Sequence, residues 1–281
     1  MAKARRKVAA TSIEHRAKTD AMIETPRVRL ERRALYGSWE AFPADPQPWY
    51  DRFRAAVEVK NLITKGRTFK KVSTLTARLE RLDRPRLPVA ERLALYRAVH
   101  SALIELITRS DDSYGEIGRF RDGVWETYLG IDWRHSGIDT EAYYQDLCEL
   151  LVWEEYGLGS RLDTLPFERV ADDEVDLIEG ILLDLEREHS EVHLRWEADS
   201  AACQVAWLLV ATGRVEGFEN AAQQLGSDHW QPVVAMAETA LERSGEDAAA
   251  SLLPPTVPAC VGITSPSIAT VSRDAVFATS T

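Results

Sequence analysis

The sequence predicts an all-α protein built of stacked helical hairpins, similar to an α-solenoid or a tetratricopeptide-like repeat. At least eight segments repeat apolar residues at helical spacing, and none shows strand-length alternation with hairpin turns. Gly-containing turns separate short helical segments that are rich in small residues, which is the pattern of stacked antiparallel helices. We therefore expect about nine helices, preceded by a mobile N-terminal arm and followed by a disordered C-terminal tail.

The N-terminal third of the chain is expected to hold an arm and two helices. Residues 1–33 are rich in Arg and Lys and have few aromatic residues, so we expect a mobile basic arm or a frayed helix that could order on a partner. The basic helical region 34–86 follows. Its first helix should begin near Pro48 and end at Gly66, and its second carries an apolar stripe over residues 69–82.

Residues 87–253 form the acidic helical-repeat body in this prediction. One helix begins at Pro88, and a later one is capped by Asp139. The helix after that is capped by Asp172 or Asp173, because either side chain can accept a hydrogen bond from the first turn.

The end of the body is expected to be a tight helical pair and one more helix. The pair turns at Gly213, and the last helix closes at Gly245, since glycine readily ends a helix. Residues 254–281 are rich in Ser, Thr, Ala, Pro and Val without helical period, so we expect a disordered tail.

Charge is distributed unevenly along the chain. Residues 1–86 carry 21 Lys and Arg against 10 Asp and Glu, a net charge of +11. Residues 87–281 carry 13 Lys and Arg against 35 Asp and Glu, a net charge of −22. This separation indicates a basic surface for an acidic partner, or attraction between the two halves or between subunits.

Composition indicates a cytoplasmic protein. The three cysteines, Cys148, Cys203 and Cys260, are widely spaced and odd in number, which is not the pattern of a disulfide framework. No apolar run approaches the roughly 18 residues of a membrane span. The first seven residues lack the apolar stretch of a signal peptide.

The histidines do not complete a metal motif. Glu186 and His189 resemble half of a di-iron Glu-x-x-His pair, and His193 follows four residues later. The nearest second half is Asp132 with His135, which is incomplete. We interpret these residues as polar helix surface, and we expect no metal and no cofactor.

The sequence also lacks a catalytic constellation, so we expect a protein that is not an enzyme. Cys148 and Cys203 lie in apolar helical stretches, where a thiol behaves as a small hydrophobe. No Gly-rich phosphate loop and no nucleophile elbow is present. An enzyme would need the aromatic middle of the chain to line a pocket with perturbed acids such as Glu154 or Glu155.

That aromatic middle is interpreted first as helix packing, with a ligand pocket as the alternative. It comprises Trp125, Trp133, Trp153, Tyr143, Tyr144 and Tyr156.

The strongest candidate for a binding surface is the basic segment 60–71. Its cations are expected to crowd the junction between two helices, where they can meet phosphates or an acidic protein face. The alternative is a solvated turn whose charges complement a helix C-terminus. Together with the cations of the arm, the candidate binding residues are Arg5, Arg6, Lys7, Lys60, Lys65, Arg67, Lys70 and Lys71.

Three short motifs carry a resemblance to a known family. They are Asp111-Asp112-Ser113 with Gly115-Glu116 and Gly118, the helix reaching Leu150 and Tyr156-Gly157, and the Leu209–Leu225 hairpin around Gly213-Arg214. Through them, residues 70–245 resemble the helical, tetratricopeptide-like region that follows the zinc finger of bacterial SWIM-finger proteins, and related helical families of unknown function. The resemblance implies a helical scaffold only, because the clustered Cys and His of the finger are missing.

Two functions remain open at this point. The leading hypothesis is a non-catalytic scaffold that docks protein partners into a larger complex, through a concave helical face or the basic third. The alternative is a nucleic-acid-associated subunit, in which the basic third binds the RNA or DNA backbone. No membrane contact is expected, and self-association stays open. Salt dependence distinguishes the two, since backbone binding weakens steeply with salt.

Overall fold

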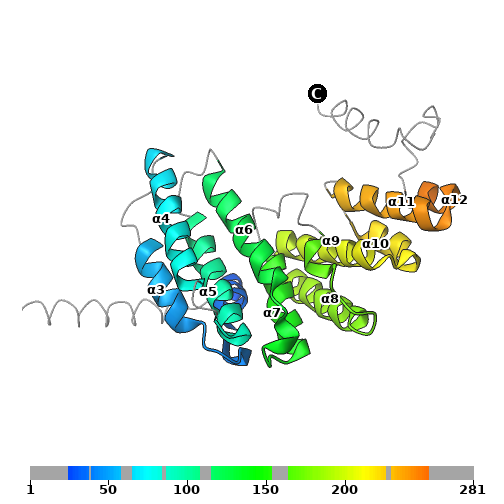
Figure 1. Cartoon of the computed structure of the whole chain (residues 1–281). Helices are drawn as coiled ribbons and strands as arrows, with labels where there is room; N and C mark the ends of the chain where they lie inside the picture. The colour runs from blue at the N-terminus through cyan, green and yellow to red at the C-terminus, as the bar shows by residue number, and fades with distance from the viewer. Residues whose placement is uncertain are drawn as a thin grey trace, which may run out of the picture.

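The computed structural model describes residues 25–37, 39–57, 65–83, 87–107, 115–153, 164–225 and 229–252. These residues form eleven α-helices, five short 3₁₀ or π turns and no strand, so the predicted all-α class is confirmed for the described part. The helices, shown in Figure 1, are α2 (Pro26–Arg32), α3 (Gln47–Val57), α4 (Lys65–Asp83), α5 (Val89–Ile107), α6 (Glu116–Gly130), α7 (Thr140–Val152), α8 (Val175–Glu191), α9 (Arg195–Thr212), α10 (Phe218–Gln224), α11 (Trp230–Ser244) and α12 (Glu246–Leu252).

Most helices pack against neighbours that are close in sequence. At one end of the molecule α3 and α6 pack on α5, and at the other end α8 pairs with α9 and α11 with α12 (Figure 1). Helix α7 lies between these groups and contacts both α8 and α9. The helices therefore form an arched row that broadly follows the chain order, except that α3 packs on α5 and α4 packs on α3 and α6 at the outer edge.

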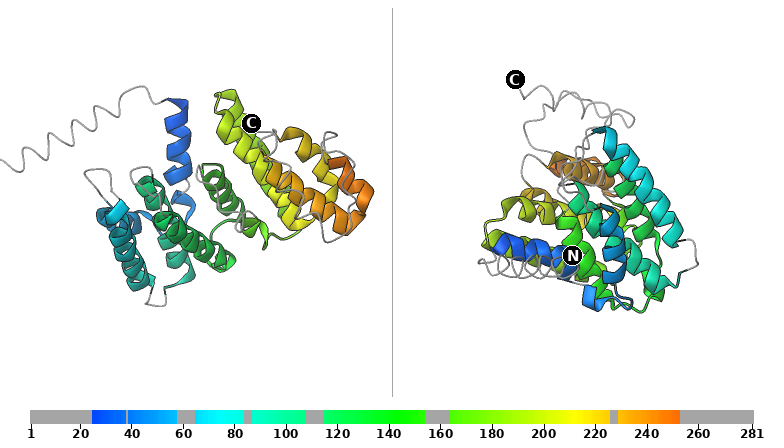
Figure 2. Two further views of the ribbon diagram at one scale, coloured as in Figure 1. Left: turned by 90° about the horizontal axis from the view of Figure 1, so that it is seen from above. Right: turned by 90° about the vertical axis from the view of Figure 1, so that its left-hand side faces the viewer.

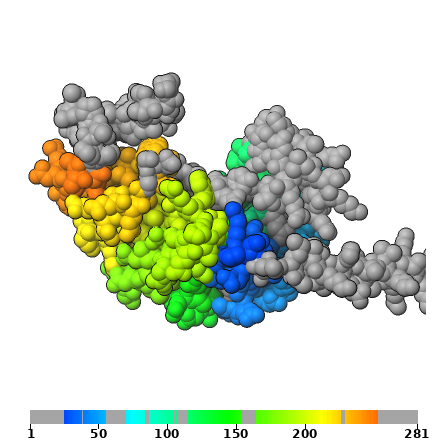
Figure 3. All heavy atoms as spheres, turned by 180° about the vertical axis from the view of Figure 1, so that it is seen from behind, coloured from blue at the N-terminus to red at the C-terminus, as the bar shows by residue number. Residues whose placement is uncertain are grey.

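The N-terminal segment breaks this order. Helix α2 continues into a π turn, η1 (Arg33–Gly37), which packs against α7 more than one hundred residues later. In the space-filling view of Figure 3 the segment, in dark blue, lies directly against the yellow-green helices. Leu30, Ala34 and Leu35 are buried there. The predicted mobility is thus wrong for residues 26–33, because α2 and the start of η1 are packed; the helix itself agrees with the alternative of a helical segment, and residues 1–24 lie outside the described part.

One hydrophobic core connects the whole row. Its buried residues run from Leu30 to Leu252 without separation into two clusters. Helix α5 lies at its centre, and every residue from Leu93 to Leu103 is buried. Because this stretch is surrounded on all sides, even its polar side chains, Arg97, His100 and Ser101, lie in the core.

The predicted helix end at Gly66 is wrong. Helix α3 ends at Val57, and Gly66 lies in the first turn of α4. The apolar stripe of α4 consists in part of Val72, Leu75 and Leu79, which are all buried. These long-range contacts stabilise the helix, and a glycine in a first turn costs less than the roughly 1 kcal/mol of a helix interior.

The predicted cap at Asp139 is confirmed, and the predicted cap at Asp172 or Asp173 is wrong. Asp139 Oδ1 accepts a hydrogen bond from the Ala142 amide at 3.2 Å. Helix α8 instead begins after Glu174, which makes no side-chain cap. The Glu174 carboxylate accepts hydrogen bonds from the Ala171 amide and the Tyr144 hydroxyl, so tertiary contacts decide its position.

The two predicted glycine turns are confirmed. Gly213 ends α9 with φ of 67°, and Gly245 ends α11 with φ of 93°. Both values lie in the left-handed region that favours glycine. The count of nine helices was too low, in part because it left out α2 and α12 at the two ends of the row.

Among the described residues, no helix is both long and apolar enough to cross a lipid bilayer.

Candidate binding surface on helix α4

The cations of the N-terminal third fall into two groups, and the first group pairs with the acidic body of the same chain. Arg33 donates two hydrogen bonds to the Glu188 carboxylate, at 2.9 and 2.6 Å. Its Nε also lies 2.9 Å from Oε1 of the buried Glu149. Arg27 is placed 3.4 Å from Glu197 and 5.9 Å from the ring of Trp153.

These pairs attach α2 and η1 to α7, α8 and α9. The viewpoint from above in Figure 2 shows α2, in dark blue, upright beside this part of the row. The arginine hydrogen bond lowers the pKa of Glu188, as expected when a carboxylate gains a cationic donor. Attraction between the halves of one chain, one of the alternatives drawn from the charge pattern, therefore accounts for Arg27 and Arg33.

The second group lies on α4, which is an edge helix. One face of α4 packs on α3 and α6 through the buried side chains of its apolar stripe. The opposite face carries Lys70, Ser73, Thr74, Ala77 and Arg81, all exposed. In Figure 1 the helix stands at the edge of the row with only one side covered by described helices.

The α4 cations are not neutralised by the described residues. Lys70, Arg78 and Arg81 form no ion pair or side-chain hydrogen bond within the part of the chain that the structure describes. The helix holds six Lys and Arg against two acids, and one acid, Asp83, is already bonded to Arg92 and Tyr96. A positive surface of this kind attracts an anionic partner.

Lys71 adds to this surface. Its side chain is half-buried, and burial lowers the pKa of Lys71. No described carboxylate compensates the desolvated ammonium group. An anionic partner that covers α4 would supply this compensation.

A wide, open hollow of about 700 Å³ borders the exposed face of α4, and all of its described lining residues lie on this one helix. Small side chains at its centre, Ser73, Thr74 and Ala77, let a partner approach the helix backbone closely. Lys70 and Arg81 stand near the two ends, about 16 Å apart along the helix axis. We call this face, made of Lys70, Lys71, Ser73, Thr74, Ala77, Arg78 and Arg81, the α4 face.

Sequence reasoning found half of the described cations of the α4 face. Lys70 and Lys71 were predicted, but their segment is the first two turns of a helix and not the predicted junction. Arg78 and Arg81 were missed, although their spacing of eight and eleven residues from Lys70 is helical. The other predicted residues, Arg5, Arg6, Lys7 and Lys60, and the side chains of Lys65 and Arg67, lie outside the described part.

The interpretation of the histidines as polar surface is wrong for His189. Its side chain is fully buried, with Nδ1 2.6 Å from the Leu185 carbonyl oxygen and the ring against Trp153. His193 is exposed on the loop after α8. No group of three His, Cys, Asp or Glu side chains in the described ranges is placed to hold a metal ion, and the absence of a metal stays a prediction.

The aromatic middle is largely core, as its first interpretation predicts. Trp125, Trp133, Trp153, Tyr143 and Tyr144 are all buried, and the Trp133 and Tyr143 rings are stacked at 4.3 Å. Tyr156, Glu154 and Glu155 lie outside the described residues.

Comparison of the chain with protein-family models, with curated proteins and with solved structures gave no match.

Proposed function

We propose that this chain is a non-catalytic helical scaffold that docks into a larger complex through the α4 face. The row of antiparallel helices is consistent with the α-solenoid or tetratricopeptide-like arrangement, which is a common support for extended binding surfaces. The partner contributes an acidic surface that neutralises the α4 cations.

The main support for the proposal is the difference in ion pairing between the two groups of cations in the basic third. Arg27 and Arg33 of the basic third bind carboxylates of their own chain, whereas Lys70, Arg78 and Arg81 have no such partner among the described residues. If the basic N-terminal third served only to stabilise the fold, carboxylates of the same chain would be expected beside the α4 cations as well as beside Arg27 and Arg33. The excess on α4 therefore favours an external partner.

The α4 face also favours the second candidate, the backbone of RNA or DNA. Its cations follow one side of a helix over about 16 Å, and Thr74 and Ser73 add hydroxyl groups that can contact phosphates. The acidic remainder would then face away from the nucleic acid. The same experiment distinguishes this candidate from an acidic protein.

The test compares the full chain with two charge-reversed variants in its native host. The first variant carries Lys70→Glu, Arg78→Glu and Arg81→Glu. The matched control carries Arg119→Glu, Arg187→Glu and Arg195→Glu, which are equally many exposed cations elsewhere. Lysates are separated by sedimentation, with and without nuclease digestion.

The proposal predicts that the wild type and the control sediment well above the 31.6 kDa of a single chain, and that the α4 variant does not. A complex that survives nuclease indicates an acidic protein partner. A complex that disappears with nuclease, and weakens steeply with salt, indicates nucleic acid. An α4 variant that sediments like the wild type removes the α4 face from consideration.

A further inference from the structure

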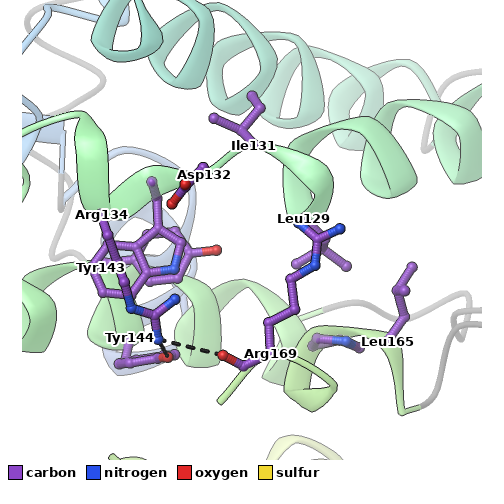
Figure 4. Close-up of a pocket in the computed structure, with 10 residues that line it drawn as sticks. Leu129, Ile131, Asp132, Arg134, Tyr143, Tyr144, Leu165 and Arg169 are labelled. Carbon is purple, nitrogen blue, oxygen red and sulfur yellow. Dashed lines mark hydrogen bonds between the residues drawn. The ribbon is translucent and has the colours of Figure 1, made fainter. Parts of the chain in front are cut away.

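A second site lies far from the α4 face, in a cavity of about 230 Å³ (Figure 4). Its walls come from the end of α6, the turn η3 (Trp133–His135), α7 and the turn η4 (Leu165–Phe167). Leu129, Leu165 and Pro166 supply apolar surface. The volume is below the roughly 300 Å³ at which pockets for drug-sized molecules begin, so the cavity suits a small ligand.

The Tyr143 hydroxyl is the unexplained group of this cavity. The side chain is only 3% exposed, and the stacked Trp133 ring holds it in place. Its hydroxyl has no hydrogen-bond partner among the described residues. The neighbouring tyrosines differ, because Tyr144 donates to Glu174 at 2.7 Å and Tyr128 to Asp146 at 3.4 Å.

The Tyr143 hydroxyl oxygen is not sealed from water but opens into the cavity, so an acceptor on a ligand can replace the water that it would otherwise bind. Burial, with a smaller contribution from Asp146, raises the pKa of Tyr143, which keeps the hydroxyl protonated and able to donate. The Arg134 and Arg169 guanidinium groups act in the opposite direction and lower this pKa. Both cations are therefore close enough to affect an acceptor bound at the hydroxyl.

The charges around the cavity leave one cation uncompensated. Arg134 stacks on Trp133 at 4.5 Å and is neutralised by Glu174, whose Oε2 lies 2.5 Å from Nη2. Arg169 stands on the facing wall in Figure 4, and among the described residues its guanidinium donates only to the Gly130 carbonyl oxygen, at 3.2 Å. No described carboxylate pairs with it.

We propose that this cavity binds a small organic anion, whose carboxylate or phosphate oxygen accepts hydrogen bonds from the Tyr143 hydroxyl and the Arg169 guanidinium. The apolar part of the ligand packs against Leu129, Leu165 and Pro166. Asp132 at the rim, 2.8 Å from His135, disfavours a ligand that carries further negative charge at its outer end.

The test uses two probes of the same shape, benzoate for a carboxylate and phenyl phosphate for a phosphate. Binding of each to the full chain is measured by ligand-observed saturation-transfer NMR and then by titration. At least one probe should bind with a Kd below about 1 mM. Tyr143→Phe should weaken binding about tenfold, because it removes one hydrogen bond to a charged acceptor, and Arg169→Gln should weaken it at least as much.

The controls separate a binding defect from a folding defect. Tyr143→Phe removes a hydroxyl that is open to water in the cavity and bonds no described residue, so its melting temperature should stay close to that of the wild type. Arg119→Gln changes an exposed arginine outside the cavity and should leave binding unchanged. Binding of benzoate alone identifies a carboxylate ligand, and binding of phenyl phosphate alone identifies a phosphate ligand. The proposal is overturned if neither probe binds at 10 mM, or if both variants keep wild-type affinity.

Discussion

The Arg97 guanidinium binds the Asp146 carboxylate inside the core, with Nε 2.9 Å from Oδ1 and 2.7 Å from Oδ2. Both side chains are completely buried, and the pair links α5 to α7. Arg97 also donates to the Ala34 carbonyl oxygen at 2.7 Å and to the Ser101 hydroxyl. Ser101 in turn donates to the Leu35 carbonyl oxygen at 2.8 Å. One charged group therefore holds the N-terminal segment on the row of helices.

Removing Asp146 should destabilise the whole fold. Asp146→Ala leaves the Arg97 charge buried without a counterion, so the free energy of unfolding should fall by about 3–5 kcal/mol. Urea denaturation followed by circular dichroism at pH 7 measures this. Asp184→Ala, which removes an exposed partner of Arg187, should change the same quantity by less than about 1 kcal/mol. An equal loss of unfolding free energy in the two variants would mean that the buried pair stabilises the fold no more than an exposed pair does.

The Arg33–Glu188 pair should contribute stability that depends on pH. The arginine hydrogen bond lowers the pKa of Glu188 below its unfolded value of about 4.3, so the contribution is complete above that pH. It is lost as pH falls through the lowered pKa. Because both side chains are more than a third exposed, Glu188→Gln should cost only about 1 kcal/mol at pH 7.

The check is the difference in unfolding free energy between the wild type and Glu188→Gln, measured from pH 7 downwards. This difference should shrink below pH 4.3 and approach zero in more acidic buffer. Glu186→Gln, on the same helix, provides the baseline for removing a carboxylate without this arginine contact. A difference that stays constant with pH would contradict the ion pair.

The C-terminal end of the folded row should lie at α12. A chain ending after Leu252 should melt at the wild-type temperature, because residues 254–281 lack patterned apolar surface. A chain ending after Gly245 should lose about 2 kcal/mol or more, since it removes the buried Leu252 and its contacts with α10 and α11. Thermal denaturation of the two truncations checks both outcomes. A lower melting temperature in the chain that ends after Leu252 would show that the tail packs.

Two glycines should respond in opposite ways to the same substitution. Gly213→Ala places a Cβ at φ of 67° and against the Arg243 guanidinium, which should cost about 1–2 kcal/mol. Gly180 lies exposed inside α8 with open space around a Cβ, so Gly180→Ala should add about 0.5–1 kcal/mol. Urea denaturation of both variants measures the signs. A stabilising Gly213→Ala would contradict the left-handed turn.

Local patterns predicted the helices well, and long-range contacts explain where they failed. Apolar spacing indicated the stripe of α4, and Asp139 was recognised as a cap because its partner is three residues away. The segment of α2 was predicted only as a mobile arm or a frayed helix, because the carboxylates that bind Arg27 and the following Arg33 come more than one hundred residues later.

The candidate sites show the same division. The cations of α4 are visible in the sequence. Only the packing shows that Arg33 has two carboxylate partners and that Lys70 and Arg81 have none among the described residues. A ligand pocket in the aromatic middle was an open alternative, but its anion-binding groups were not predicted, because Tyr143 and Arg169 lie far apart in sequence and form no local pattern. His189 was misplaced because its burial depends on contact with Trp153 from another helix.

Site-specific photocrosslinking tests the docking surface most directly. A photoreactive residue is placed at Ala77, the small exposed residue in the middle of the α4 face, and at Gly180 on α8 as the control. After irradiation in the native host, the account predicts a discrete adduct at position 77 and none at position 180. The adduct should disappear when Lys70, Arg78 and Arg81 are changed to Glu. An adduct at position 180 alone, or one at position 77 that survives the charge reversal, would contradict docking through the α4 face.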